Sequence, residues 1–308
     1  MNPFLVALLL PSIFWTEGPK TAPTLRDAHI QRILAPAPVA AQWKGVAGIS
    51  VESADLTGTV KLPVPRVDYR INEASASQEP WIYSNGWRLM RQPSARFYYD
   101  VPGAAAALAA AEAFAYGVNA VIHTDSAGLT PLGEMLAFLA PLDRPQGPVL
   151  ANIGFIDDGS PQSGELMNLL IRRNLLIRIV PQPDPQLNLT VRFGTGGYSK
   201  AEAADPNKLE HKIRADLTDS KRLLRIYGTS VVIGRLTGTP DRVRLHLLNY
   251  ASRPVTGMRV RVLGEFPHHA IAASGLPSAS PLDYEIVRGG TEFTIDKLNT
   301  YAVVDLSK

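Results

Sequence analysis

The sequence predicts an α/β region followed by an all-β C-terminal region. Up to about residue 217, short apolar strands alternate with helical patterns, and beyond that point the chain switches to strands alone. In this later part Val243, Leu245 and Leu247 alternate with Arg and His, which is typical of an antiparallel sheet with one buried and one solvated face. We therefore expect a C-terminal antiparallel β-sandwich.

The amino-acid composition excludes several classes of protein and of functional site. A chain of 308 residues is long enough for two or three compact units, and 45% hydrophobic with 19% charged residues excludes disorder. The net charge is only +3 and no basic tract occurs, so we expect no nucleic-acid partner. The absence of cysteine excludes disulfides, zinc–thiolate sites, Fe–S clusters and thiol nucleophiles. His268 and His269 are adjacent, which is a poor ligand pattern, so we expect neither a metal nor a cofactor.

An apolar run opens the chain, from Phe4 to Leu10 and on through Ile13, Phe14 and Trp15. Its length of about 12 residues falls short of the roughly 20 that cross a bilayer, so we expect no membrane span. The run suits the apolar core of a signal peptide, which we predict over residues 1–22. The protein would then be secreted or periplasmic. The alternative is a buried N-terminal strand or helix.

Residues 23–145 are predicted to form the first α/β region. An apolar strand over residues 96–101 is followed by an Ala-rich helix over 104–116, and Gly117 ends that helix. A further strand over 119–123 completes a strand–helix–strand unit with parallel strands.

Residues 146–218 are predicted to form a second α/β region. One strand is expected over residues 148–156 and another over 175–180. Ser160 followed by Pro161, and Asp205 followed by Pro206, each predict the start of a helix, because Ser and Asp cap helix N-termini and Pro suits the first turn. Residues 219–308 form the expected sandwich. Its strands are predicted over residues 222–227, 230–236, 242–249, 257–263, 283–287, 292–295 and 301–306.

The last hundred residues resemble the small β-sandwich that closes many multidomain glycoside hydrolases. The segments that carry this resemblance are residues 244–250, RLHLLNY, residues 253–262, RPVTGMRVRV, residues 293–295, FTI, and residues 301–306, YAVVDL.

The region before it is similar to two other parts of such enzymes. Residues 152–159, NIGFIDDG, resemble the glutamine-amidotransferase-like domain of barrel-type β-galactosidases, where it supports trimerisation without chemistry, and residues 110–121 are similar to a late helix and strand of a glycosidase barrel. The resemblance implies the non-catalytic C-terminal part of a multidomain glycoside hydrolase, with an incomplete or reduced barrel-like or flavodoxin-like α/β region. Too few strand–helix units precede residue 146 for a complete barrel of about 200 residues or more. Either the barrel is reduced or the chain is only part of such an enzyme.

Catalytic candidates are few. Amidotransferase chemistry needs a Cys that is absent, and no G-x-S-x-G elbow occurs. Glycoside hydrolysis needs two carboxylates, and Asp100, Asp125 and Asp157 fall at predicted strand ends, where α/β folds place their sites. The alternative for each is a turn or a helix cap. His123 with Asp125 is a candidate proton-handling pair.

The segment from residue 80 to 88, PWIYSNGWR, is the best binding candidate. Trp81 and Trp87 offer flat apolar faces, and Asn85 and Arg88 offer hydrogen-bonding groups, a combination that suits sugars. The alternative is that both Trp side chains belong to the core and Arg88 extends over it.

These observations favour an exported, glycosidase-related protein that binds carbohydrate or acts as an assembly module. The alternative is an active glycoside hydrolase that uses strand-end carboxylates, and a third hypothesis is a purely structural module. A carbohydrate ligand and self-association into a homo-oligomer are the partners that the sequence leaves open.

Overall fold

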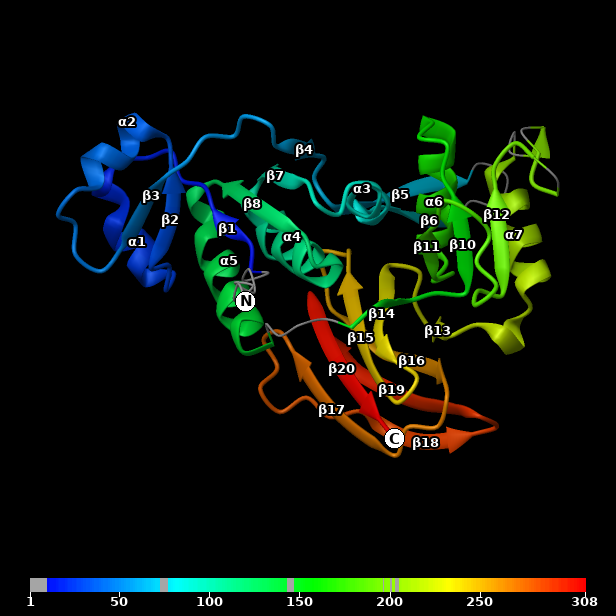
Figure 1. The fold of residues 1–308 in the computed structure, drawn as a ribbon. Helices are drawn as coiled ribbons and strands as arrows, with labels where there is room; N and C mark the ends of the chain where they lie inside the picture. The colour runs from blue at the N-terminus through cyan, green and yellow to red at the C-terminus, as the bar shows by residue number, and fades with distance from the viewer. Residues whose placement is uncertain (1–9, 73–76, 143–146, 196, 200, 203–204) are drawn as a thin grey trace, which may run out of the picture. The chain divides into compact units, whose positions relative to one another are not determined.

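In the computed structural model, residues 10–72, 77–142, 147–195, 197–199, 201–202 and 205–308 are described (Figure 1). The chain divides into two compact units, each built from two stretches of sequence. Unit 1 comprises Met1–Arg66 and Gln92–Pro145, and unit 2 comprises Val67–Arg91 and Gln146–Lys308. Each unit is described by itself.

Unit 1 is organised around parallel strands. Four of them lie in the order β1-β8-β7-β4, and β2 pairs with β3 in a second parallel sheet. A bridge between Phe14 and Leu34 links the two sheets. The strands are β1 (Ser12–Ile13), β2 (Arg32–Ala35), β3 (Ser50–Ser53), β4 (Val60–Leu62), β7 (Arg96–Val101) and β8 (Asn119–Thr124).

The predicted strand–helix–strand unit is confirmed. Between the parallel strands β7 and β8 runs helix α4 (Gly103–Tyr116), and Gly117 ends it with a left-handed φ of 65°. Gly103 also permits a close helix contact, because a Cβ there would lie 2.6 Å from the Gly128 backbone nitrogen of α5 (Ser126–Leu139). The remaining helical segments of unit 1 are α1 (Ala22–Asp27), α2 (Ala37–Ala40) and the 3-10 turns Pro19–Thr21, Ala41–Trp43 and Ala140–Leu142.

The N-terminal segment contributes to this unit from Ser12 onward. β1 pairs with β8, and the Trp15 side chain is 1% exposed and donates a hydrogen bond to Thr21 over 2.9 Å. The predicted signal peptide, residues 1–22, therefore overlaps folded structure, whereas residues 1–9 lie outside the described part of the chain. Export remains a prediction.

Unit 2 contains a three-stranded parallel sheet in the order β11-β10-β12. Both predicted N-caps of its helices are confirmed, because Ser160 accepts from the Ser163 N–H and Asp205 accepts from the Lys208 N–H. The elements are β10 (Ile153–Ile156), α6 (Pro161–Arg172), β11 (Ile177–Ile179), β12 (Leu189–Arg192), α7 (Pro206–Leu217) and the 3-10 turn Asp219–Lys221. A two-stranded sheet and a short helix precede them, formed by β5 (Arg66–Asn72), β6 (Ser77–Tyr83) and α3 (Gly86–Arg91).

The antiparallel sheets expected after residue 218 are present, drawn from yellow to red in Figure 1. Val260 and Phe293 of one sheet and Leu245 and Val304 of the other belong to one buried core, so the two sheets pack face to face. One sheet has the order β13 (Leu224–Tyr227), β16 (Val255–Leu263), β19 (Gly290–Leu298), β18 (Leu282–Val287), and the other the order β17 (His268–Ala273), β20 (Tyr301–Ser307), β15 (Arg242–Asn249), β14 (Val232–Thr239), β9 (Val149–Leu150).

The prediction of one continuous strand over residues 148–156 is wrong, because this segment is divided between two sheets. β9 pairs with β14 of the sandwich, whereas β10 lies in the parallel sheet. Asn152 stands between them, and its side chain donates to the Lys221 carbonyl over 2.7 Å and accepts from the Leu223 N–H over 2.9 Å. These bonds compete with strand pairing and fix the chain where it changes sheet.

Candidate functional site

A pocket of about 500 Å³ opens in unit 1 at the carboxyl ends of parallel strands. Asp100 is next to last in β7, His123 is next to last in β8, and Glu17 follows β1. Because the three strands run parallel in one sheet, their carboxyl ends meet at one edge, where α/β folds hold ligands. The lining residues are Thr16, Glu17, Asp100, Val101, Pro102, His123, Thr124 and Asp125.

Asp100 forms the charged centre of this pocket. One carboxylate oxygen contacts His123 Nδ1 at 2.9 Å, and the other accepts from Lys61 Nζ at 3.1 Å. Strand register explains the first contact, since Asp100 and His123 are paired between β7 and β8. The hydrogen bonds from His123 and Lys61 lower the pKa of Asp100 below its ordinary value. With its side chain 43% exposed, Asp100 is an accessible anion that can accept hydrogen bonds.

Asp125 has a structural role at the same edge. One carboxylate oxygen accepts from the Gly128 N–H and the other from the Gly103 N–H, both over 3.1 Å. Asp125 is thus the N-cap of α5 and also holds the start of α4. His123, the partner expected for Asp125, is paired with Asp100 instead.

Asp157, the third carboxylate candidate, belongs to unit 2 and not to this pocket. It forms a two-pronged ion pair with Arg91 of α3, at 2.7 and 2.8 Å, and its side chain is 10% exposed. Arg91 also donates to the Ser160 carbonyl at the start of α6. Arg91 therefore ties the end of α3 to the segment between β10 and α6, which gives the ion pair a structural role.

The segment from residue 80 to 88 does not form one flat surface. β6 ends at Tyr83 and α3 begins at Gly86, so the chain changes direction between Trp81 and Trp87. Asn85 is 1% exposed, and its backbone carbonyl accepts from Arg88 and Leu89 in the first turn of the helix.

Trp87 packs within unit 2. A Cβ at Gly164 of α6 would lie 2.7 Å from the Trp87 ring, so the indole rests directly on that helix. The guanidinium groups of Arg88 and Arg91 lie 4.2 and 4.6 Å from the ring centroid. Trp87 is half-buried, so it is not a residue of the fully buried core, and its role in sugar binding stays a prediction.

Trp81 lies elsewhere, in a second cavity of about 510 Å³ in unit 2. The Arg172 guanidinium stacks 3.6 Å from its ring centroid. The sequence does not predict this cavity, because its arginines come from segments that are far apart in the chain. The one local signal is the adjacent pair Arg172 and Arg173 at the end of α6. The lining residues are Pro80, Trp81, Arg172, Arg173, Asn174, Asn207, Arg214, Arg222, Arg225, Ile226, Tyr227, Thr229 and Ser230.

Two further observations concern the described residues. None of their helices combines the length and apolarity that a bilayer crossing needs. Over the same part of the chain, no three His, Asp or Glu side chains gather closely enough to hold a metal ion.

No protein-family model and no curated protein matches this sequence. Among solved structures, an α-L-fucosidase isoenzyme 2 from Paenibacillus thiaminolyticus is similar with a TM-score of 0.53 and 10% identity, over 69% of this chain and 60% of that one. An exo-carrageenase GH42 from Bacteroides ovatus gives a TM-score of 0.44 and 9% identity, over 84% and 48% of the two chains. A maltogenic α-amylase from Thermotoga neapolitana gives 0.26 and 9%, over 97% and 99%.

Of these, only the fucosidase likeness exceeds a TM-score of 0.5, and at 10% identity it concerns the fold alone. The chain spans 60% of the fucosidase structure and has a glycosidase-like fold.

Proposed function

We propose that this protein is an exported, glycosidase-related carbohydrate-binding protein, and that its sugar site is the strand-end pocket of unit 1. The observation that carries the proposal is the Asp100–His123–Lys61 cluster at the edge of a pocket of about 500 Å³. A carboxylate acceptor between two nitrogen donors suits the hydroxyl groups of a sugar, each of which both donates and accepts.

The state of the carboxylates favours binding over hydrolysis. A glycosidase needs a protonated carboxylic acid with a raised pKa beside a second carboxylate. Asp100 has a lowered pKa, which suits an acceptor or a nucleophile and not the acid. Both oxygens of Asp125 are engaged by backbone N–H groups.

Sugar titrations of matched variants test the proposal. Neutral oligosaccharides should bind the native protein, and Asp100→Asn should weaken binding about ten-fold or more, because a hydrogen bond to a charged group is lost. Asp55→Asn is the control, since this exposed carboxylate of unit 1 bonds locally, to the Thr57 N–H, and lies outside the pocket lining. Equal weakening in both variants, or no binding to any sugar in calorimetry, would contradict the assignment.

The second candidate function is hydrolysis. It is favoured by one observation: Asp100 and Glu17 are two carboxylates in one pocket. Release of reducing ends from a panel of glycosides, abolished separately by Asp100→Asn and Glu17→Gln, would support an active hydrolase. Binding without product release would leave the first function.

The finer architecture belongs to the same proposal. Unit 1 is a reduced glycosidase barrel, supported by the pairing of β1 with β8, which joins the first and last strands of the unit as barrel closure does. The parallel sheet of unit 2 corresponds to an amidotransferase-like domain that serves assembly. Sedimentation of the full chain should then show a homo-oligomer, and fractionation of the producing cells should place it in the periplasm or the medium.

A further inference from the structure

The second cavity, in unit 2, is lined by arginines from four separate places in the chain. Arg172 and Arg173 end α6, Arg214 lies in the last turn of α7, Arg222 precedes β13, and Arg225 lies within β13. No Asp or Glu occurs among the described residues that line the cavity. The fold therefore concentrates positive charge that the overall charge of +3 does not reveal.

Two carboxylates near the cavity, Asp219 and Glu210, contact three of its arginines. Asp219 is shared, because it accepts from Arg214 at 3.2 Å and from Arg222 at 3.3 Å. Glu210 lies 3.8 Å from Arg173 and is also contacted by His211 at 3.3 Å. Arg173, Arg214 and Arg222 thus share two carboxylates as ion-pair partners.

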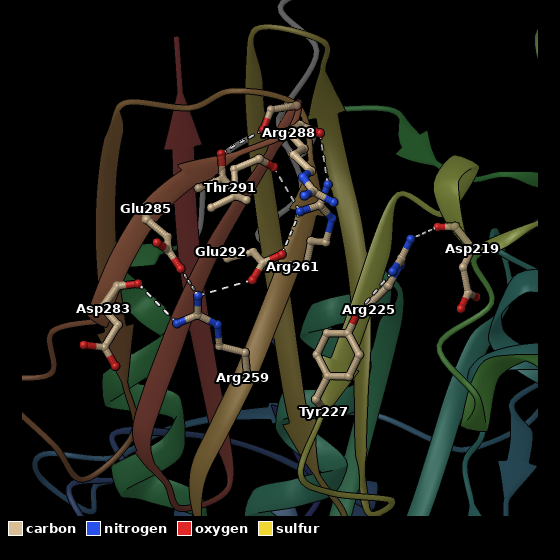
Figure 2. Close-up of polar contacts among 12 residues, drawn as sticks. Asp219, Arg225, Tyr227, Arg259, Arg261, Asp283, Glu285, Arg288, Thr291 and Glu292 are labelled. Atoms are coloured by element: carbon tan, nitrogen blue, oxygen red, sulfur yellow. Dashed lines mark hydrogen bonds and ion pairs between the residues drawn. The ribbon is translucent and has the colours of Figure 1, made fainter.

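Within the described part of the chain, Arg225 donates hydrogen bonds to uncharged oxygens. It donates to the Asp219 backbone carbonyl, and to the Tyr227 hydroxyl over 3.3 Å (Figure 2). On the same sheet, Arg259 is turned toward Glu285 and Glu292, so its charge is locally matched. Arg225 has no such carboxylate within its described hydrogen bonds.

Arg222 is held in the wall of the cavity and is 9% exposed. Its Nη2 donates to the carbonyls of Arg173 and Asn174 at the end of α6, and its Nε finds no hydrogen-bond partner among the described residues. Burial, together with the positive charges of Arg214 and Arg225, lowers its pKa. An anion in the cavity would relieve this repulsion.

The remaining lining has the chemistry of a sugar site. Trp81 and Tyr227 supply aromatic rings, Asn174 and Asn207 supply amides, and Thr229 with Ser230 supply hydroxyls. Rings beside polar groups are the usual surroundings of a bound sugar.

We propose that this cavity binds an acidic saccharide, with the arginines holding its carboxylate or sulfate group. The planar guanidinium fork matches both oxyanions. That the ligand is a saccharide rests on the proposed function. That the cavity binds an oxyanion rests on the cavity alone and does not involve the strand-end pocket.

Calorimetry on the full chain tests this with glucuronic acid, glucose 6-sulfate, glucose and inorganic sulfate. Both acidic sugars should bind at least ten-fold more tightly than glucose. Added NaCl should weaken the binding of both acidic sugars, because salt screens the charges. Arg225→Met should reduce their affinity about ten-fold or more, because it removes the charge while keeping an unbranched side chain. Arg259→Met, on the same sheet but outside the lining, is the matched control and should leave binding unchanged.

Each outcome decides a part of the proposal. Equal binding of glucose and the acidic sugars, no binding of either acidic sugar or of inorganic sulfate, or an equal loss in Arg225→Met and Arg259→Met would overturn the oxyanion site. Inorganic sulfate binding as tightly as glucose 6-sulfate would overturn the saccharide part. Asp100→Asn should leave acidic-sugar binding intact, so failure at the strand-end pocket and failure at this cavity are distinguishable.

Discussion

A single buried histidine in unit 2, His246, makes the stability of this unit depend on pH. His246 on β15 is fully buried, and its Nδ1 lies 2.6 Å from the Tyr301 hydroxyl of β20. Burial, with the charges of Arg235 and Arg244 nearby, lowers the pKa of His246 well below its ordinary value. The imidazole is therefore neutral in the folded protein, whereas in the unfolded chain it takes up a proton below about pH 6.5.

This difference predicts a loss of stability in mild acid. Since the unfolded state binds the extra proton, the free energy of unfolding should fall as the pH drops below about 6.5, by up to about 1.4 kcal/mol per pH unit. His246→Gln removes the titrating group and should flatten the fall between pH 6.5 and 5, whereas the exposed His29→Asn should retain it. Urea unfolding at several pH values measures both. An identical pH dependence in native protein and His246→Gln would contradict the buried neutral state.

At the scale of elements, the shortest strand of unit 1 has a central position. β1 has two residues, yet it pairs with β8 on one side, and Phe14 just beyond it bridges to Leu34 on the other. Trp15 adds a buried indole to the same segment. The segment therefore joins the two parallel sheets of the unit.

Truncation at two points measures what this segment contributes. A chain that begins at Leu10 keeps β1, whereas one that begins at Pro23 lacks it and also lacks Trp15. We expect the shorter chain to be less stable by about 3–5 kcal/mol, the cost of removing a large buried aromatic side chain. Thermal melts followed by circular dichroism compare the two. Equal melting temperatures would show that residues 10–22 are dispensable, as a cleaved signal peptide through residue 22 requires.

At the scale of the whole molecule, the sandwich draws on residues outside 219–308. β9 lies at the edge of one sheet, and Leu176, 7% exposed, belongs to the sandwich core, with Leu150 packed against it. Leu176 and Leu150 precede the region that sequence patterns assign to the sandwich. Its core is consequently closed by the neighbouring α/β segment of the same unit.

Two fragments test this dependence. A fragment of residues 147–308 retains β9, Leu150 and Leu176, and a fragment of residues 219–308 loses all three. We expect the shorter fragment to give a cooperative β-type melt but to be less stable by about 2–4 kcal/mol, from the apolar side chains no longer covered. Denaturant unfolding of both fragments gives the difference. Equal stability would show that the sandwich is complete without β9 and Leu176.

Local sequence patterns predicted those structural features that depend on residues close together in the chain. The Gly117 helix end, the Ser160 and Asp205 caps, the parallel β7–α4–β8 unit and the alternating sandwich strands all depend on residues within a few positions of one another. Strand β17 and helix α3 were not predicted, because their short sequences lack a clear period and are fixed by packing.

By itself, the sequence determined the fold class, the change from α/β to antiparallel strands, and the set of strand-end carboxylates, since these follow from periodicity and capping. Tertiary structure decided which of these groups meet. Register paired Asp100 with His123, helix starts engaged Asp125, and packing separated Trp81 from Trp87. It also gathered arginines from the end of α6, the end of α7 and the region of β13 around one cavity. No local pattern reports such proximity, because it is set by which faces of remote elements are buried together.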